Sequence, residues 1–302
     1  MSRRGVTWAV LTAVMVGLFS AAFATRAAWE TARPLPAPAQ TRALLAEILP
    51  EQEFTDATSA PALFVVYGQP LTLDMAGWLL LGDGGEYGPA GVGGSVNGPP
   101  ALAPARTVET VRHNLAARGW KLYPDLVREV YSCAGPPCDP TTIPTSTTIQ
   151  ARRGDTAFTM EVFPTYTGNT TSLAATFTRT APWPVYPAAV AGGLLGAAAA
   201  YLLFAWVARR AGDRRSKILL GVALVCWWGP TLLSFPTATA HHFSEPHPSA
   251  HPLWEWLGQP TFSLLFLIGC ACALTTVAMA FAREWSSRAT PTSWSPQPPH
   301  GR

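Results

Sequence analysis

Four stretches of this sequence are long and apolar, and none of them contains Asp, Glu, Lys, Arg or His. They are residues 5–24, 185–207, 218–235 and 260–282. A helix needs about 20 mostly apolar residues to cross the hydrocarbon core of a bilayer. Of the 302 residues, 48% are hydrophobic and only 13% are charged, against about 25% charged in an ordinary soluble domain. These features predict an integral membrane protein with four transmembrane helices.

The basic residues of the connections predict how these helices are oriented. The pieces 1–24, 208–217 and 283–302 together carry a net charge of +8, whereas 25–184 carries −3 and the connection 236–259 has no Lys or Arg. Because Lys and Arg concentrate in cytoplasmic loops, we expect both termini and 208–217 inside the plasma (cytoplasmic) membrane. Residues 25–184 and 236–259 are then outside. We interpret the basic residues as topogenic signals rather than binding patches.

The first apolar segment has two interpretations. Arg3 and Arg4, the apolar run and the Ala22-Phe23-Ala24 sequence also describe a cleavable signal peptide. The run is long enough, about 30 Å at helical rise, to be an uncleaved anchor, which is the interpretation we favour for residues 1–24. Either alternative leaves 25–184 outside.

The outer part is predicted to contain a stalk and one small folded domain. Residues 25–60 include the Pro-rich segment Arg33–Pro38 and a short helix over 41–49, and we interpret them as the stalk. The domain is predicted over 61–182, with the Gly- and Pro-rich stretch 82–100 as a loop.

The pattern of apolar residues predicts one helix and several strands in this domain, and the apolar run Ala62–Tyr67 is suited to the first of these strands. The helix is expected over Thr107–Arg118, with Thr107 as its N-cap and Gly119 directly after its end. Apolar residues alternate with polar ones in the other predicted strands, which are Thr148–Arg152, Thr156–Phe163 and Leu173–Thr178. The predicted fold class is therefore four transmembrane helices plus a small extracytoplasmic α+β domain, with a helix packed on an antiparallel sheet. A disordered cytoplasmic tail, 283–302, follows.

Two of the five cysteines lie in the predicted outer domain. Cys133 and Cys138 enclose Ala-Gly-Pro-Pro, in a compartment that permits disulfides, and we predict a disulfide between them. Cys226, Cys270 and Cys272 lie within predicted spans and are interpreted as small packing residues.

Four of the six histidines occur within 11 residues of the outer connection 236–259. They are His241, His242, His247 and His251. Imidazoles are good ligands for Zn and Cu, so a metal site is one hypothesis. The spacing matches no regular metal motif, and polar residues are also what an outer connection needs.

The sequence predicts partners only in general terms. The bilayer is one, and a membrane or envelope protein is another. Gly192, Gly196 and Ala200 form a stripe of small residues in the second span, which suggests a homo-oligomer. The overall charge of +3 is too small an excess to suggest nucleic acid.

Three functional hypotheses follow. The first is a non-enzymatic envelope scaffold or accessory subunit whose outer domain binds a partner or ligand, with no cofactor. The second is Zn or Cu handling through the histidines. The third is an enzyme in the outer domain, for which the available carboxylates are Glu109, Asp125, Glu129, Asp139 and Asp155. No spacing pairs these carboxylates for acid–base work, so no catalytic residue is assigned.

Overall fold

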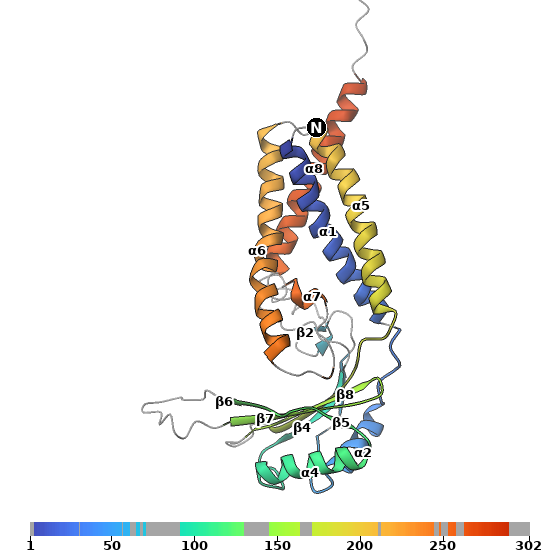
Figure 1. Ribbon diagram of the computed structural model, residues 1–302, viewed down its shortest axis with the longest axis vertical. Coiled ribbons are helices and arrows are strands. Elements are labelled where there is room, and N and C mark those ends of the chain that lie inside the picture. Colours follow the sequence, from blue (N-terminus) through green and yellow to red (C-terminus); the bar gives the residue numbers. More distant parts are fainter. Residues whose placement is uncertain are drawn as a thin grey trace, which may run out of the picture.

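The computed structural model describes residues 3–29, 31–55, 57–60, 65–66, 69–70, 91–129, 145–163, 171–210, 213–244, 248, 253–257 and 263–289. In this part of the chain a bundle of long helices stands on one face of a sheet domain (Figure 1). The bundle helices are α1 (Arg3–Trp29), α5 (Val185–Arg210), α6 (Arg214–Ser244) and α8 (Ser263–Ala289), with the short α7 (Leu253–Trp256) beside them.

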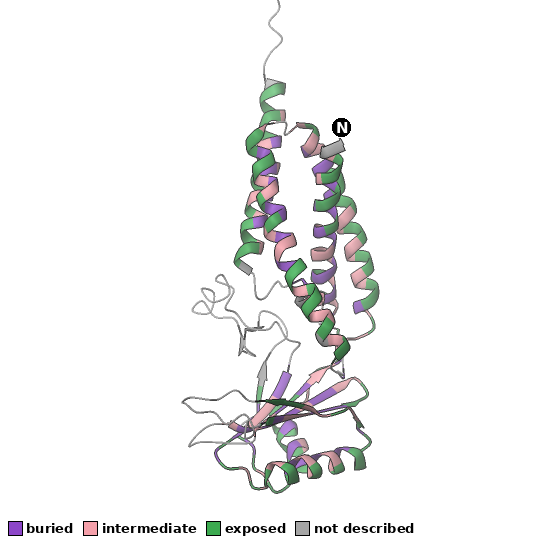
Figure 2. Ribbon diagram, turned by 60° about the vertical axis from the view of Figure 1, so that its left-hand side comes forward, coloured by how far each residue is buried: buried purple, intermediate pink, exposed green. Residues whose placement is uncertain are grey.

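Each of the four predicted spans corresponds to one long helix. All four are long and apolar enough to cross a membrane. Figure 2 shows exposed residues on the outer sides of these helices and buried residues between them. On α5, Leu194, Leu195 and Leu202 are 68%, 73% and 69% exposed. Apolar surface of this extent is unfavourable in water and suits a lipid environment.

The helix α6 is longer than the span predicted at 218–235. It has 31 residues and continues through Pro230 and Pro236 to Ser244, so the first residues of the predicted connection 236–259 are helical. Hydroxyls near the prolines donate to carbonyls of the same helix, as from Thr231 to Trp227 (3.0 Å) and from Thr237 to Ser234 (2.9 Å). Such bonds help membrane helices to tolerate proline.

The first span packs against the second along the stripe of small residues. A Cβ atom on Gly192 would lie 2.6 Å from the Cβ of Ala24, and one on Gly196 would lie 2.2 Å from Oγ of Ser20. These contacts run in opposite directions along α1 and α5, so the two helices are antiparallel. Within the chain, α1 covers Gly192 and Gly196, and Ala200 is buried in the bundle. The homo-oligomer expected through these residues stays a prediction.

The sheet domain contains an antiparallel sheet with two helices on one face. Its strand order is β1-β4-β9-β8-β7-β5, with β6 also paired to β7. The strands are β1 (Thr58–Ala60), β4 (Gly91–Asn97), β5 (Lys121–Leu122), β6 (Leu126–Glu129), β7 (Thr145–Arg153), β8 (Thr156–Val162) and β9 (Thr171–Arg179). A separate two-stranded pair joins β2 (Val65–Val66) to β3 (Gln69–Pro70). The helices α2 (Pro38–Ile48) and α4 (Pro104–Ala117) cover the face remote from the bundle (Figure 1).

Large apolar side chains fill the space between the sheet and these two helices. Phe158 and Phe177 are paired across β8 and β9 with ring centroids 5.0 Å apart, and Trp120 packs beside both. Val111 and Leu115 of α4 are fully buried against this layer.

The helix α4 begins earlier than predicted and ends where predicted. It starts at Pro104, and its N-cap is Ala103. Thr107 is fully buried inside the helix, where its hydroxyl bonds to the Ala103 carbonyl at 3.3 Å, so it is not the N-cap. Gly119 has φ +74° directly after the C-cap, and the Trp120 amide donates to the Leu115 carbonyl at 3.1 Å. This is the Schellman ending that the glycine predicts.

The predicted stalk, whose expected helix over 41–49 corresponds to α2, and the predicted loop 82–100 both contribute to the fold of the sheet domain. In the predicted stalk, Leu45, Ile48 and Leu49 are buried in the domain core, and β1 pairs with β4. The core therefore reaches back well before residue 61. In the predicted loop 82–100, residues 91–97 form β4, which pairs with β9.

Charged side chains pair at the end of the bundle that is remote from the sheet. The start of α1, the α5–α6 junction and the end of α8 lie together at the end remote from the sheet (Figure 1). Here Arg283 pairs with Asp213 at 2.7 Å, and Arg210 pairs with Glu284. The Arg283 guanidinium, helped by the Ser216 hydroxyl, holds the pKa of the Asp213 carboxyl well below its usual value.

Candidate functional site

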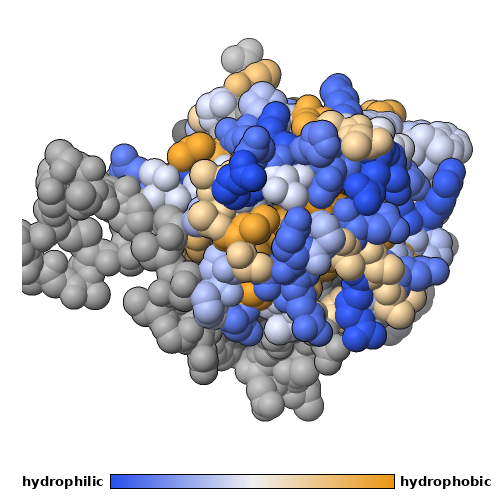
Figure 3. Space-filling model, turned by 90° about the horizontal axis from the view of Figure 1, so that it is seen from below, coloured by the Kyte–Doolittle hydropathy of each residue, from blue (hydrophilic) through white to orange (hydrophobic). Residues whose placement is uncertain are grey.

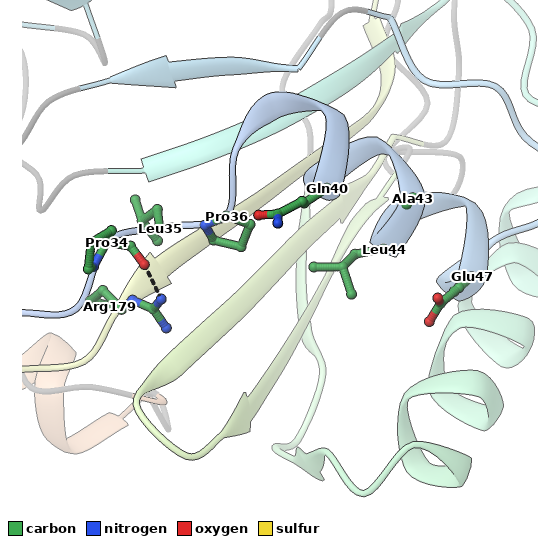
Figure 4. Close-up of a pocket in the computed structure, with 8 residues that line it drawn as sticks. All are labelled: Pro34, Leu35, Pro36, Gln40, Ala43, Leu44, Glu47 and Arg179. Carbon is green, nitrogen blue, oxygen red and sulfur yellow. Dashed lines mark hydrogen bonds between the residues drawn. The ribbon is translucent and has the colours of Figure 1, made fainter.

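An open groove of the sheet domain lies between α2 and the segment that precedes it. We call residues 31–37 the strap and the recess the strap groove. The groove has a volume of about 600 Å³ and is lined by Pro34, Leu35, Pro36, Gln40, Ala43, Leu44, Glu47 and Arg179. Figure 4 shows Arg179 near the strap end of this row and Glu47 near the other end, with apolar side chains between.

The strap is held in place by Arg179 at the end of β9. Its guanidinium donates to the carbonyls of Arg33 (3.0 Å) and Pro34, and it pairs with Asp155 at 3.1 Å. Asp155 also pairs with Arg33 at 3.5 Å. A Pro-rich segment would otherwise be a loose spacer. These bonds make it one wall of the groove.

The helix α2 forms the other wall. Pro38 occupies its first turn, where the missing N–H costs nothing. The side chain of Gln40 accepts a hydrogen bond from the Ala37 amide at 3.1 Å. Leu45 and Ile48 of α2 are buried in the domain core, while Leu44 is only partly buried and forms part of the groove.

The polar groups that line the groove already have partners within the chain. Arg179 holds the strap, Gln40 caps α2, and Glu47 pairs with Arg118 of the α4 C-terminus at 3.4 Å. Acid–base or nucleophilic catalysis needs a polar group directed at a substrate. This surface instead presents an apolar floor with a cation near one end and an anion near the other, which suits binding.

The carboxylates considered for catalysis are dispersed in the structure. Glu109 pairs with Arg106 at 3.2 Å, Asp125 pairs with Arg112, and Asp155 pairs with Arg179. Glu129 is exposed on β6, and Asp139 lies outside the described residues. His113, the only histidine of 61–182, is exposed on α4.

The histidine hypothesis falls partly outside the described residues. His241 and His242 lie in the last turn of α6, whereas His247 and His251 are not described. The His242 ring packs edge-on to Trp256, with centroids 5.8 Å apart. Among the residues that the structure describes, no group of three or more His, Cys, Asp or Glu side chains could hold a metal ion. The metal site remains a prediction.

The predicted disulfide also falls outside the described residues, because Cys133 and Cys138 lie in the segment 130–144. It too remains a prediction. Cys226, Cys270 and Cys272 are unpaired and partly buried in α6 and α8.

Sequence reasoning missed the groove. The sequence shows the prolines of the strap, but the strap becomes a wall of the groove only because Arg179 binds it. Arg179 is 145 residues from Pro34 in the sequence. No local pattern marks Arg179 for this role.

No protein-family model matches the chain, and no curated protein or solved structure matches it either.

Proposed function

We propose that this protein is a non-enzymatic, multi-pass protein of the plasma membrane whose sheet domain lies outside the cell and binds a partner protein through the strap groove. The observation that carries the proposal is the groove itself, a recess of about 600 Å³ with apolar walls and polar groups engaged within the chain.

The placement of charge supports the orientation. Arg209, Arg214, Arg215 and Lys217 are all exposed at the end of the bundle remote from the sheet. Positive residues favour the cytoplasmic side, so the sheet domain belongs on the outer side. The groove is then open to envelope or extracellular proteins.

The packing of α1 supports its retention as an uncleaved anchor. Ala22 is 2% exposed, and Ala24 packs against Gly192 of α5. Cleavage after Ala24 would remove most of a helix that fills the bundle. The intact mass of the purified protein tests this, since loss of residues 1–24 would contradict it.

The shape of the groove indicates what kind of partner segment it takes. From Gln40 to Glu47 the α2 wall spans about 10 Å, the length of about three residues of extended chain. The walls are Pro34, Leu35, Pro36 and Leu44, which favour apolar side chains. We propose that a short extended segment with an apolar residue in its middle is bound there. The face of the sheet domain remote from the bundle is mostly hydrophilic, with apolar patches between the polar residues (Figure 3).

A pair of matched alanines tests the proposal. Ala43 is exposed in the groove, and Ala116 is exposed on α4 outside it. A photo-crosslinking amino acid at position 43, in the full chain in intact cells, is expected to capture one defined protein, whereas the same residue at 116 is not. Ala43→Arg should abolish binding of that purified partner to the full-length protein, while Ala116→Arg should leave it unchanged. Equal capture at both positions, or unchanged binding to Ala43→Arg, would contradict the proposal.

A further inference from the structure

The bundle carries a second groove, between α1 and α6 near the ends where both helices begin. It has a volume of about 480 Å³ and is lined by Thr7, Trp8, Leu11, Gly221, Leu224 and Val225. Gly221 lies close to the Trp8 ring, since a Cβ on it would be in van der Waals contact with that ring at 3.5 Å. Val225 is 72% exposed and Leu11 39% exposed, so the groove opens to the surroundings of the bundle.

The cations at this end of the bundle divide into two groups. Arg210 and Arg283 are neutralised by Glu284 and Asp213. Arg214, Arg215 and Lys217 at the start of α6 are exposed and have no ion pair with any described acidic residue. This end therefore retains uncompensated positive charge beside an apolar groove.

The helical register places two of these cations in line with the groove. Lys217 precedes Gly221 by four residues and Arg214 precedes it by seven, which are spacings of residues on one face of a helix. The arrangement is an apolar channel that leads to a cationic rim.

We infer that the α1–α6 groove binds an anionic phospholipid, with one acyl chain along Trp8, Leu11 and Val225 and the phosphate beside Lys217 and Arg214. The apolar channel and the cationic rim together match the two chemical parts of such a lipid. Basic pockets between membrane helices are suited to acidic headgroups. A second copy of this chain would bring the same unpaired cations to the interface, and like charges repel.

The test uses the full-length protein purified in non-ionic detergent, with native mass spectrometry to count bound lipids. Phosphatidylglycerol is expected to stay bound under conditions that remove phosphatidylcholine of the same acyl chains. Lys217→Gln should weaken phosphatidylglycerol binding about fivefold, the effect of one cation near a charged membrane surface. Arg209→Gln is the matched control, because it removes a cation from the same end of the bundle on α5, which does not line the groove.

Gly221→Leu provides an independent variant that leaves every charge in place. The added side chain occupies the channel, so phosphatidylglycerol binding is expected to fall to the level of phosphatidylcholine. Glycerol phosphate, which lacks acyl chains, is expected not to displace the lipid at equal concentration. Equal binding of the two lipids, equal losses in Lys217→Gln and Arg209→Gln, or displacement by glycerol phosphate would each overturn the inference.

Discussion

The sheet domain and the α1–α5 pair are held together by opposite kinds of side chain. The centre of the domain contains Phe158, Phe177 and Trp120, whose rings lie within about 6 Å of one another. The α1–α5 contact consists of residues such as Gly192, Gly196 and Ser20. In water, burial of large apolar surface is the main stabilising term. Between helices in lipid, burial of apolar surface gives no such stabilisation, and helices associate instead through the close backbone packing that small residues allow. This difference is what we expect if the sheet domain folds in water and the long apolar helices fold in lipid.

The largest expected effect is in the sheet domain. Phe158→Ala should destabilise the domain by about 3–5 kcal/mol, because it removes a fully buried ring and leaves a cavity. Hydrogen exchange of β8 and β9 amides in the detergent-solubilised full chain measures this loss. Thr159→Ala, on the opposite face of the same strand, is the control and should cost less than about 1 kcal/mol. Similar losses of stability in Phe158→Ala and Thr159→Ala would show that the Phe158 ring is not at the centre of the core.

A smaller effect is expected when the small-residue contact of the bundle is overpacked. Gly196→Leu should cost about 1–3 kcal/mol, because its Cβ alone would overlap Ser20. Gly229→Leu in α6 adds the same bulk where a Cβ has no atom within 4 Å, and it should be close to neutral. Thermal unfolding of the two purified variants, followed by circular dichroism, provides the comparison. Equal melting temperatures would contradict the close α1–α5 contact.

A third prediction isolates backbone conformation from packing. Gly154 has φ +62° in the β7–β8 turn, and a Cβ there would contact nothing within 4 Å. Gly154→Ala should therefore cost about 1 kcal/mol through the left-handed backbone alone. The same hydrogen-exchange experiment measures it. A cost as large as that of Phe158→Ala would imply that the turn carries contacts that the structure does not show.

The smallest expected effect concerns the charged end of the bundle. The folded pKa of Asp213 is lowered below its ordinary value of 3.8 by Arg283, so its stabilising contribution is present above pH 3.8. That contribution is lost as the pH falls from there toward the lowered pKa. Asp213→Asn should lower the melting temperature slightly at pH 7. Between pH 4 and pH 2 the melting temperature of this variant should then fall less than that of the unaltered protein. If the melting temperature of the variant depends on pH as that of the unaltered protein does, the Arg283–Asp213 ion pair does not contribute to stability.

The spans and the regular strands could be predicted because their signals are local. A charge-free apolar run predicts a membrane helix whatever its neighbours are. The alternation of Phe158, Met160 and Val162 likewise predicts a strand with one buried face, and all three are buried.

The strand β4 could not be predicted, because its glycines are explained only by close contacts with segments that are distant in the sequence. A Cβ on Gly93 would lie 2.2 Å from the Ala175 carbonyl oxygen, and one on Gly94 would lie 3.3 Å from the Cβ of Phe54. Such glycines permit close packing, but in sequence they look like a flexible loop. The strap groove was hidden for a related reason, since Arg179 reaches it from the end of β9.

The most direct test of the account is the side of the membrane on which each end of the bundle lies. Paired phosphatase and fluorescent-protein reporters would be inserted near Asp213 and Pro248 and fused after Arg302 in the full chain. We predict cytoplasmic behaviour at Asp213 and Arg302 and external behaviour at Pro248, whose carbonyl lies 3.4 Å from Arg152 of the sheet domain. An external signal from Asp213, or a cytoplasmic one from Pro248, would contradict an outer binding domain anchored by four spans.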